Sequence, residues 1–332
     1  MEGKRKPIAK VCKSTTEGSE VMILTVTLNP ALDKNYVVEN FALSGIHRVE
    51  SMSTIPAGKG VNVSRVLQQL QIPTKATGIL GGHTGKLIQS LLDEEKVAND
   101  FVWIRAESRC SILIVDEVKQ VHTEVIEPGP TIPQGAIGRL NRKLEQLATQ
   151  SSWVVFSGSP PPDTTPQIYY NMIKLVKKSG VKVALDTRGP WLKTGIKAQP
   201  DLIKPNWDEF QELVGPCYST VQAFEKAKAL VDQGIETVVV SMGSKGALAV
   251  HGNKSYQISN LPPIEVVSPV GSGDSLVAGL LATLQRGGDF PEAFCNGVAI
   301  ATSNAAHFGA GVFTFEEVAS LQKKISIEKI PF

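Results

Sequence analysis

The strongest chemical signal in this chain is Gly271-Ser272-Gly273-Asp274, which separates a short apolar run from a helical pattern of apolar residues. Glycines let the backbone approach a ligand closely, and the free N–H groups at a helix start favour an anion such as phosphate. A carboxylate beside an anion site adds like charge, so Asp274 needs a reason to be there. A base that guides a hydroxyl toward phosphorus is one such reason, and a helix N-cap is the plain alternative.

A second glycine-rich element lies at residues 58–62 (GKGVN), again at the start of a helical pattern. Its glycines leave free N–H groups facing a ligand, while Lys59 adds a point charge and the Asn62 amide can bond a hydroxyl. Asp33 follows the first predicted strand, and its carboxylate suits the hydroxyl groups of a polyol. A glycine turn before a helix and a turn aspartate are the plain alternatives for these two features.

Two further segments suit a metal ion or a nucleotide. Asn206 stands at a predicted strand end and Glu209 follows one helical turn later, so both can reach one point as ligands of magnesium or of its waters. The same spacing is that of an N-cap with a capping-box glutamate. Residues 241–246 (SMGSKG) join two strand patterns, where they suit either the lining of a nucleotide site or a hairpin turn.

Other familiar motifs are absent or incomplete. Residues 81–87 (GGHTGKL) look like a phosphate-binding P-loop, but Leu80 and Leu87 stand where that motif needs its first glycine and its magnesium hydroxyl. The five histidines are scattered and suit structural roles better than catalytic ones. The four cysteines form no CxxC pair, which argues against a zinc site and a disulfide framework and fits a reducing cytoplasm.

Composition narrows the class of protein further. The chain has 332 residues, 42% of them hydrophobic and 20% charged, with a net charge of only +2, so nothing calls for nucleic acid or a membrane surface as partner. It contains no apolar run long enough for a transmembrane helix. Residues 1–21 are basic and then rich in serine and threonine, without the apolar core of a secretory signal, so we expect a flexible extension and a cytoplasmic protein.

Short apolar runs alternate along the chain with helical patterns. The runs are rich in valine and isoleucine and mostly lack alternation, which is typical of strands buried on both faces. We predict strands at 22–28, 76–80, 153–156, 181–185, 202–204, 237–241 and 247–251, and helices at 61–70, 85–95, 137–149, 166–179, 208–214, 221–233, 274–286, 291–307 and 315–324. This order predicts an α/β fold with a mostly parallel central sheet covered by helices on both faces. Ligands of such sheets bind beyond the carboxyl ends of the strands.

Two segments break this alternation. Residues 33–56 and 108–127 show strand-like patterns without a following helix, and each comes soon after a strand of the core. We predict that they form one small β-sheet that stands off the main sheet as a lid, with one face over a substrate and the other hidden, for example against a second subunit. Two separate surface hairpins are the plain alternative.

Taken together and in this order, these segments resemble the PfkB (ribokinase-like) carbohydrate kinases over residues 22 to about 315. VGSGDSLVAG is similar to the C-terminal signature of that family, with Ser272 in place of the usual alanine. AGKGVNVSRVL matches its N-terminal glycine motif, and KPNWDE carries its Asn-x-x-Glu element. TVTLNPALD and SGSPPP are most similar to the phosphosugar branch, which includes 1-phosphofructokinase, tagatose-6-phosphate kinase and the minor 6-phosphofructokinase.

The resemblance implies a Rossmann-like three-layer core in a single kinase domain over residues 22–332, with the β-lid forming the contact of a homodimer. It implies transfer of the γ-phosphoryl group of ATP, with Mg²⁺, to a hydroxyl of a phosphorylated ketohexose of the fructose 1-phosphate or tagatose 6-phosphate type. A role for a monovalent cation stays open. The partners it implies are small molecules and a second copy of the chain, with no nucleic acid and no membrane.

The resemblance also implies roles for individual residues. Asp274 becomes the catalytic base, in an anion hole for the transferred phosphoryl group formed by Gly271, Ser272 and Gly273. The residues implied around the sugar phosphate are Asp33, Gly58, Lys59, Gly60, Asn62, Arg109, Ser157 and Gly158. The residues implied around the nucleotide are Lys204, Asn206, Ser241, Gly243 and Gly246, with Asn206 and Glu209 at the magnesium ion.

Two departures from the family pattern bear on the substrate. Glu124 is acidic where the 6-phosphofructokinase type carries a basic residue, which disfavours fructose 6-phosphate as the obligate substrate. Arg188 replaces a serine or cysteine and lies either near nucleotide phosphates or in a surface ion pair. Two other functions stay open: a kinase of an unphosphorylated sugar or nucleoside, which the cations Lys59 and Arg109 disfavour, and a non-catalytic sugar-phosphate sensor, which the intact Gly-Asp element disfavours.

Overall fold

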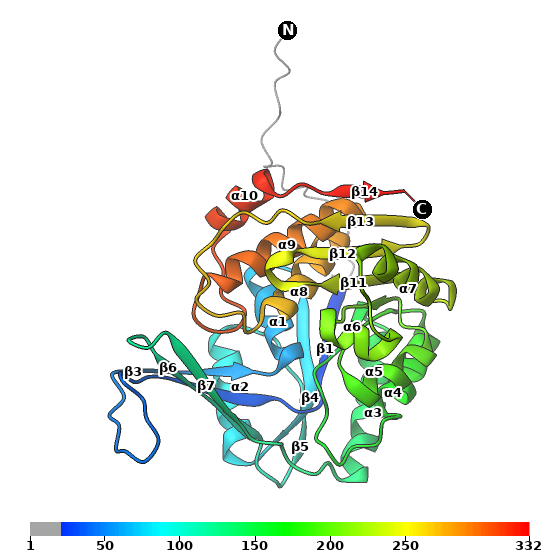
Figure 1. The fold of residues 1–332 in the computed structure, drawn as a ribbon. Helices are drawn as coiled ribbons and strands as arrows, with labels where there is room; N and C mark the ends of the chain where they lie inside the picture. The colour runs from blue at the N-terminus through cyan, green and yellow to red at the C-terminus, as the bar shows by residue number, and fades with distance from the viewer. Residues whose placement is uncertain (1–20, 332) are drawn as a thin grey trace.

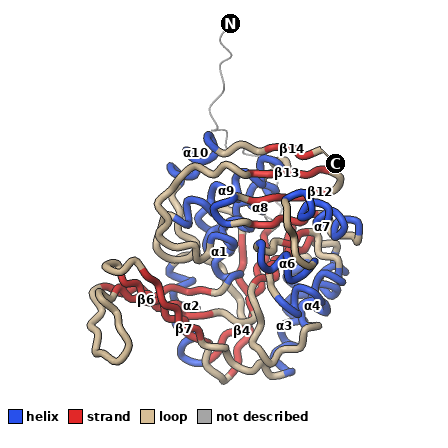
Figure 2. Tube along the Cα trace, viewed as in Figure 1, coloured by secondary structure: helices blue, strands red, loops and turns tan. Residues whose placement is uncertain are grey.

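The structure is a computed structural model that describes residues 21–331. The predicted extension over residues 1–21 therefore lies, apart from Val21, outside the described part, and its flexibility stays a prediction. Two sheets of unequal size organise the described residues (Figure 1 and Figure 2). The larger sheet carries the core, and the smaller sheet protrudes to one side of it. No helix within residues 21–331 is long and apolar enough to cross a lipid bilayer.

The larger sheet has ten strands, which are β1 (Met22–Thr27), β4 (Thr74–Gly81), β5 (Val102–Ile104), β8 (Ser151–Ser157), β9 (Lys182–Asp186), β10 (Leu202–Ile203), β11 (Thr237–Ser241), β12 (Ala247–His251), β13 (Lys254–Ile258) and β14 (Glu328–Ile330). Their order is β14-β13-β12-β11-β10-β9-β8-β1-β4-β5. All neighbours from β11 to β5 pair in parallel, whereas β12, β13 and β14 are antiparallel additions at one edge. The carboxyl ends of seven parallel strands therefore meet along one side of the sheet.

Helices cover both faces of this sheet. One face packs against α3 (Gln134–Ala148), α4 (Ile168–Val176), α5 (Gly189–Gly195), α6 (Trp207–Val214) and α7 (Thr220–Asp232). The other packs against α1 (Lys59–Gln69), α8 (Ser272–Gln285), α9 (Phe290–Ala305) and α10 (Phe315–Lys324). A third cluster joins α2 (Gly82–Glu94) to the base of the smaller sheet. Short 3₁₀ turns occur at η1 (Lys177–Ser179), η2 (Ile196–Ala198) and η3 (Gly243–Lys245).

The smaller sheet has four strands in the order β3-β2-β6-β7, formed by β2 (Ala31–Val37), β3 (Ser51–Ala57), β6 (Arg109–Asp116) and β7 (Val121–Ile126). β2 pairs with β6 in parallel, so the two inserted segments form one sheet and not two separate hairpins. The pairing places Asp33 beside Ser111 and Leu113 beside Glu124. Since neighbours in register point to the same face, one face carries polar residues toward the main sheet.

The predicted α/β fold is confirmed, with its mostly parallel sheet between two helical layers and its small separate sheet. Every predicted strand and helix has a counterpart in the structure. The sequence patterns missed β5, β13, β14 and α5, all of which are short. β13 and β14 lie at the antiparallel edge of the sheet, and neither contains an apolar run.

Candidate active site

A cavity of about 710 Å³ lies between the carboxyl edge of the main sheet and the polar face of the smaller sheet. The starts of α1 and α8, the turn between β10 and α6, and the hairpin between β11 and β12 all border it. It therefore brings together segments that are up to 277 residues apart in sequence, from Asp33 to Ala310. Its position beyond the strand ends is where sheets of this kind bind ligands.

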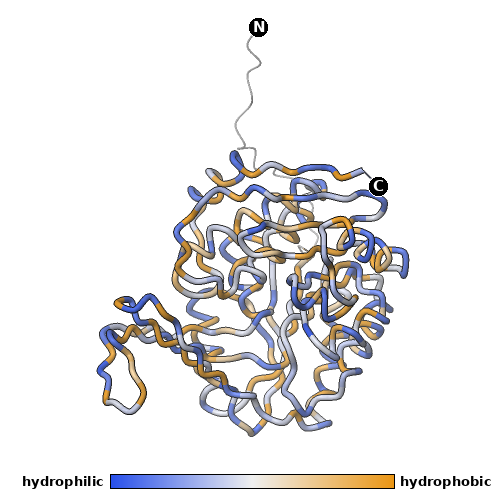
Figure 3. The backbone as a smooth tube through the Cα atoms, viewed as in Figure 1, coloured by the Kyte–Doolittle hydropathy of each residue, from blue (hydrophilic) through white to orange (hydrophobic). Residues whose placement is uncertain are grey.

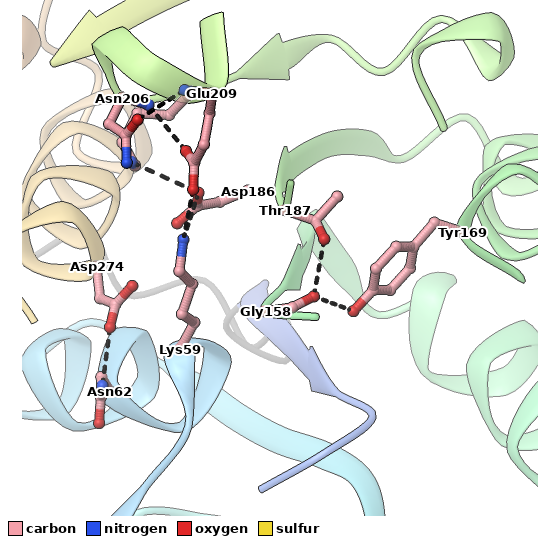
Figure 4. A network of polar contacts seen from close by, with 10 residues as sticks. Lys59, Asn62, Gly158, Tyr169, Asp186, Thr187, Asn206, Glu209 and Asp274 are labelled. Atoms are coloured by element: carbon pink, nitrogen blue, oxygen red, sulfur yellow. Dashed lines mark hydrogen bonds and ion pairs between the residues drawn. The ribbon is translucent and has the colours of Figure 1, made fainter. Parts of the chain in front are cut away.

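Asp274 is in the first turn of α8 and lines the cavity, although its side chain is only 4% exposed. Its Oδ2 accepts a hydrogen bond of 2.8 Å from Asn62 Nδ2, which α1 presents from the opposite wall (Figure 4). Burial raises the pKa of Asp274 to about 7, while the Lys59 ammonium acts against this rise. The position of Asp274 in the same cavity as residues 58–62 and Asn206 is the convergence that its proposed chemistry requires.

The backbone before Asp274 forms a tight loop. Gly271 has φ +80°, and a Cβ on it would lie 2.6 Å from Ala310 Cα, so both conformation and space require glycine there. The Ser272 N–H donates to Pro269 O. Within residues 21–331 the N–H groups of Gly273 and Asp274 donate to no backbone acceptor, so these two remain for an anion.

A buried charge network lies next to this loop. The Asp186 carboxylate is 1% exposed, and its Oδ1 lies 3.1 Å from Lys59 Nζ and 3.5 Å from Lys204 Nζ. Burial would raise the pKa of Asp186, but the two ammonium groups outweigh burial and lower it. Burial likewise opposes the charge on Lys59, and three neighbouring carboxylates, led by Asp186, raise its pKa. A Cβ on Gly273 would lie 3.1 Å from Lys204 Nζ, so this cation also lies beside the loop of α8.

Asp186 lies directly beneath the cavity lining, and no motif of the sequence points to it. It is the last residue of β9, at the carboxyl edge of the sheet, next to Ser157 of β8 in register. A lone acid after a valine-rich strand was the available signal, and its two lysine partners lie 127 and 18 residues away in sequence. Only the fold shows that the three charges meet.

Asn206 and Glu209 confirm the plain alternative stated for them, a capping box at the start of α6. The Asn206 side chain accepts from Glu209 N at 2.8 Å, and Glu209 Oε2 accepts from Asn206 N at 2.9 Å. Both residues also line the cavity, and Glu209 Oε1 lies 4.0 Å from Lys59 Nζ. The cap therefore holds the second glutamate oxygen at the cavity wall, so the capping role and a ligand role are compatible.

The cavity wall around Glu209 could hold magnesium only together with phosphate oxygens and waters. Among the described residues no cluster of three or more histidines, cysteines or acids could hold a metal ion by itself. Glu209 offers a carboxylate oxygen at the cavity wall. Asp186 does not line the cavity; its Oδ1 contacts Lys59 and Lys204, which do, and its Oδ2 is buried without a hydrogen-bond partner. Such a donor set matches magnesium, which is usually bound by one or two carboxylates together with phosphate oxygens and waters.

The end of the cavity under the smaller sheet combines one cation with two acids. Arg109 lines it, and its Nε donates to Asn29 O at 3.1 Å, which fixes the guanidinium while leaving its other N–H groups. Burial raises the pKa of Asp33 to about 6, with Arg109 lowering it and Glu124 raising it. Glu124 lines the same end from β7. The Lys59 ammonium does not lie here but points toward Asp186 (Figure 4).

The opposite end of the cavity is bordered by the turn between β11 and β12. Ser241, Gly243 and Gly246 all line it, and the two strands are antiparallel neighbours. The segment therefore both forms a hairpin turn and lines the cavity, which were stated above as alternatives. Gly246 has φ +89°, and a Cβ there would lie 1.8 Å from Ile258 O, so glycine is required. Apolar side chains surround this end, namely Ala247, Leu261, Pro263, Ile264, Val298 and Ala301.

Three residues that were predicted to contact the sugar do not line the cavity: Gly60, Ser157 and Gly158. A Cβ on Gly60 would lie 2.4 Å from Thr27 Oγ1, so this glycine allows α1 to pack on β1. Ser157 is fully buried at the end of β8. The Gly158 carbonyl accepts from Tyr169 Oη and Thr187 Oγ1 behind the site (Figure 4). In this structure the three residues lie behind the cavity lining, and their predicted contact with the sugar stays a prediction.

The remaining sequence features lie outside the cavity. Arg188 is exposed at the start of α5 and does not line it. The P-loop-like segment forms the start of α2, where a carboxylate of the chain itself takes the anion position. Glu107 accepts hydrogen bonds from the N–H groups of His83 at 3.0 Å and Thr84 at 2.9 Å.

Comparison with known proteins agrees with this geometry. Residues 27–316 match the model of the pfkB family carbohydrate kinases. A tagatose-6-phosphate kinase of Staphylococcus epidermidis is 38% identical over 269 residues, which are 79% of this chain and 85% of that protein. Phosphofructokinase-2 of Escherichia coli, solved with substrates and products, superposes with a TM-score of 0.87 at 26% identity, over 92% of this chain and 99% of that one. Its tetrameric inhibited form gives 0.85 at 26% identity, with the same coverage.

The family match contains the whole smaller sheet and every residue that lines the cavity, and it leaves out most of β1 and all of β14. The resemblance carried by the three sequence motifs is thereby confirmed. This chain belongs to the pfkB family of carbohydrate kinases.

Proposed function

We propose that this protein transfers the γ-phosphoryl group of MgATP to a hydroxyl of a phosphorylated ketohexose of the fructose 1-phosphate or tagatose 6-phosphate type. The observation that carries the proposal is the position of Asp274. Its carboxylate is almost completely buried, yet it lines the cavity beside two free N–H groups at the start of α8. Such a pairing of base and anion site suits phosphoryl transfer.

Asp274 is the general base in this proposal. Asn62 engages Oδ2, which leaves Oδ1 to accept the proton of the acceptor hydroxyl. A pKa of about 7 means that the carboxylate is largely ionised just above neutral pH and still basic enough to take a proton in transfer. A loose transition state needs little early deprotonation, so orientation of the hydroxyl is the larger part of the contribution.

The negative charge of the transferred phosphoryl group is stabilised by groups of the protein and by magnesium. The N–H groups of Gly273 and Asp274 face it from the helix, and Lys204 lies beside them. Magnesium, when bound at Glu209, would neutralise phosphate charge. Donors that are fixed in advance stabilise developing charge without reorganising during the reaction.

Arg109 supports a phosphorylated acceptor. It is the cation at the end of the cavity formed by the smaller sheet, whereas Lys59 is held at Asp186 on the nucleotide side. A guanidinium whose Nε is already fixed presents its remaining N–H groups in a fork that matches phosphate oxygens. The similarity to a tagatose-6-phosphate kinase favours the same class of substrate.

The smaller sheet is proposed to close over the sugar and to form a homodimer contact. Its outer face carries Tyr36, Met52, Ile112, Ile114 and Val125, which neighbour one another in register. Met52 is 71% exposed and Val125 is 55% exposed, and hydrophobic residues continue into the long loop of this region (Figure 3). An exposed apolar sheet face of this kind is typical of an interface. The cytoplasmic location stays a prediction.

The test is an ADP-release assay on the purified chain with MgATP and a panel of acceptors: tagatose 6-phosphate, fructose 1-phosphate, fructose 6-phosphate, fructose and nucleosides. The proposal predicts turnover with one of the first two sugars. Turnover restricted to unphosphorylated acceptors would contradict the assigned substrate class. Binding of a sugar phosphate without any ADP release would favour the non-catalytic sensor.

A further inference from the structure

Asn304, near the end of α9, is a fully buried polar residue to which the mechanism has so far given no role. Its side chain makes five hydrogen bonds, which use the carbonyl oxygen and both N–H directions of the amide. It does not line the cavity. Replacing a buried amide with this many partners costs free energy, because each partner then becomes a buried polar group without a hydrogen bond.

The amide nitrogen of Asn304 holds the loop in front of Asp274. Its Nδ2 donates to Val270 O at 2.9 Å and to Ser272 Oγ at 3.2 Å. These two residues flank Gly271, whose left-handed backbone turns the chain into α8. Asn304 therefore fixes the loop on both sides of the turn that aims the free N–H groups of α8.

The carbonyl oxygen of Asn304 holds the segments on either side of the same loop. It accepts from Ser275 Oγ at 3.2 Å, one residue after Asp274. It also accepts from the backbone N–H groups of Gly311 at 2.7 Å and Val312 at 3.2 Å. One side chain thus joins α9 to the start of α8 and to the loop over residues 309–312.

That loop continues the connection to the opposite wall of the cavity. Arg65 Nη1 donates to Ala310 O at 2.8 Å, and Gln69 Nε2 donates to Gly311 O at 2.8 Å. Both donors are on α1, the helix that presents Asn62 to the Asp274 carboxylate. The relative position of base, anion loop and base-orienting amide therefore depends on contacts that converge on Asn304.

We propose that Asn304 is a positioning residue for phosphoryl transfer: its amide fixes residues 270–272 relative to Asp274 and so aims the N–H groups of α8 at the transferred phosphoryl group. This inference rests on the proposed function. It assigns to a residue outside the cavity an effect on kcat with little effect on the KM of the sugar phosphate. The partners of Asn304 are Val270, Ser272, Ser275, Gly311 and Val312, and neither Arg109 nor Asp33 is among them. A displacement of catalytic groups by about 1 Å is enough to reduce a rate on the order of 10²-fold.

Two variants separate the contacts. Asn304→Asp keeps an oxygen for Ser275, Gly311 and Val312 but loses both donations to the loop, whereas Asn304→Leu loses all five bonds. Asn296 supplies the matched control, since it is on the same helix and its Nδ2 donates to Thr283 Oγ1 at 2.7 Å on α8. Asn296 lies about two helical turns from Asn304, away from the loop. Asn296→Asp and Asn296→Leu should loosen the same pair of helices without touching the anion site.

We expect both Asn304 variants to lose on the order of 10²-fold in kcat, with the KM of the sugar phosphate unchanged and the circular dichroism spectrum of the parental chain retained. The Asn296 variants should keep the parental kcat. Should Asn304→Leu fail to fold, Asn304→Asp decides the question. Parental kcat in a folded Asn304→Asp chain, or an equal loss in Asn296→Asp, would overturn the inference.

Hydrogen exchange supplies a readout that does not depend on activity. Peptides covering residues 268–276 should exchange faster in Asn304→Asp than in the parental chain, and at the parental rate in Asn296→Asp. Unchanged exchange in that region would overturn the positioning role even if the enzyme is active. An inactive parental chain would contradict the proposed function, while the exchange result would still test the positioning on its own.

Discussion

Two helices of this protein have similar glycine-containing N-termini but differ in what lies at their first N–H groups. α2 and α8 each start at a glycine with positive φ, Gly82 in one case and Gly271 in the other. At α2 the Glu107 carboxylate accepts from two N–H groups of the first turn, and these hydrogen bonds lower its pKa to about 2. At α8 the N–H groups open onto the cavity beside Asp274.

The comparison shows what a glycine-opened helix start does and does not predict. Its local backbone creates a place for an anion in both cases. Whether the anion is a ligand or a side chain of the same protein depends on a residue that can be far away in sequence, here Glu107 at about 24 residues from His83. Where a side chain of the same protein occupies the N-terminus of the helix, as Glu107 does at α2, that N-terminus has a structural role. Where the N-terminus opens onto a cavity, as at α8, it is available to bind a ligand.

The largest effect is expected at α8. Asp274→Asn keeps the shape of the side chain but removes the base, so kcat should fall on the order of 10²-fold or more. Nucleotide affinity should be retained, because the backbone N–H groups stay in place. Steady-state kinetics and a fluorescence titration with ADP measure the two quantities. Glu107→Gln, the matched change at α2, should leave kcat unaltered. Near-parental turnover in Asp274→Asn would contradict the catalytic role that distinguishes the start of α8 from that of α2.

Arg109→Ala should produce the next largest effect. Loss of a charged partner for phosphate costs about 1.5–3 kcal/mol, so the KM of the phosphorylated ketohexose should rise by about 10- to 100-fold. Arg109→Lys should restore part of the affinity, since an ammonium keeps the charge without the fork. Initial-rate kinetics with a phosphorylated and an unphosphorylated acceptor measure the selectivity. An equal loss for both acceptors would assign Arg109 to general packing.

The pH dependence of kcat should follow the raised pKa of Asp274. The base works only when ionised, so kcat should be constant above about pH 7 and fall by about tenfold for each unit below it. The same shift has the opposite sign for stability, because a carboxyl with a raised pKa favours folding when protonated and loses that contribution as pH rises through 7. Asp274→Asn should therefore raise the melting temperature at pH 8 and not at pH 4. A flat kcat profile between pH 5 and 8 would contradict the role of base.

The smallest effect is expected at α2. The pKa of Glu107 is lowered in the folded chain, so its contribution to stability is present above about pH 4.5 and is lost as pH falls through about 2. Glu107→Gln should melt slightly below the parental chain at pH 7, and the difference should shrink toward pH 3. Scanning calorimetry across this range measures it. A difference that grows in acid would mean that the carboxylate does not cap α2.

Much of the fold could be predicted because valine-rich runs and helical spacing are local properties. The strand of residues 237–241 and the helix of residues 315–324 appear where the pattern places them. The pairing of β2 with β6 was expected only as a shared sheet, and its parallel register could not be predicted from either segment alone. The strands β13 and β14 were not predicted because they are short, and their sequences KSYQI and EKI contain no apolar run.

Some residues of the candidate site could likewise be predicted from the sequence, and others could not. Asp274, Asn62 and Arg109 could be identified because motifs surround them, and the structure brings all three to one cavity. Asp186 and Asn304 carry no motif, and their partners come from distant segments. Ser157 was assigned through the family resemblance. It lies fully buried at the end of β8, and burial of a strand end depends on the elements that pack around it.

The most direct test of the central claim is a crystal structure of the protein with ADP, tagatose 6-phosphate or fructose 1-phosphate, and an aluminium fluoride anion in place of the transferred phosphoryl group. The account predicts the anion on the N–H groups of Gly273 and Asp274, the acceptor hydroxyl on Asp274 Oδ1, and the sugar phosphate on Arg109. An anion bound elsewhere in the cavity, with the Asp274 carboxylate contacting neither ligand, would contradict it.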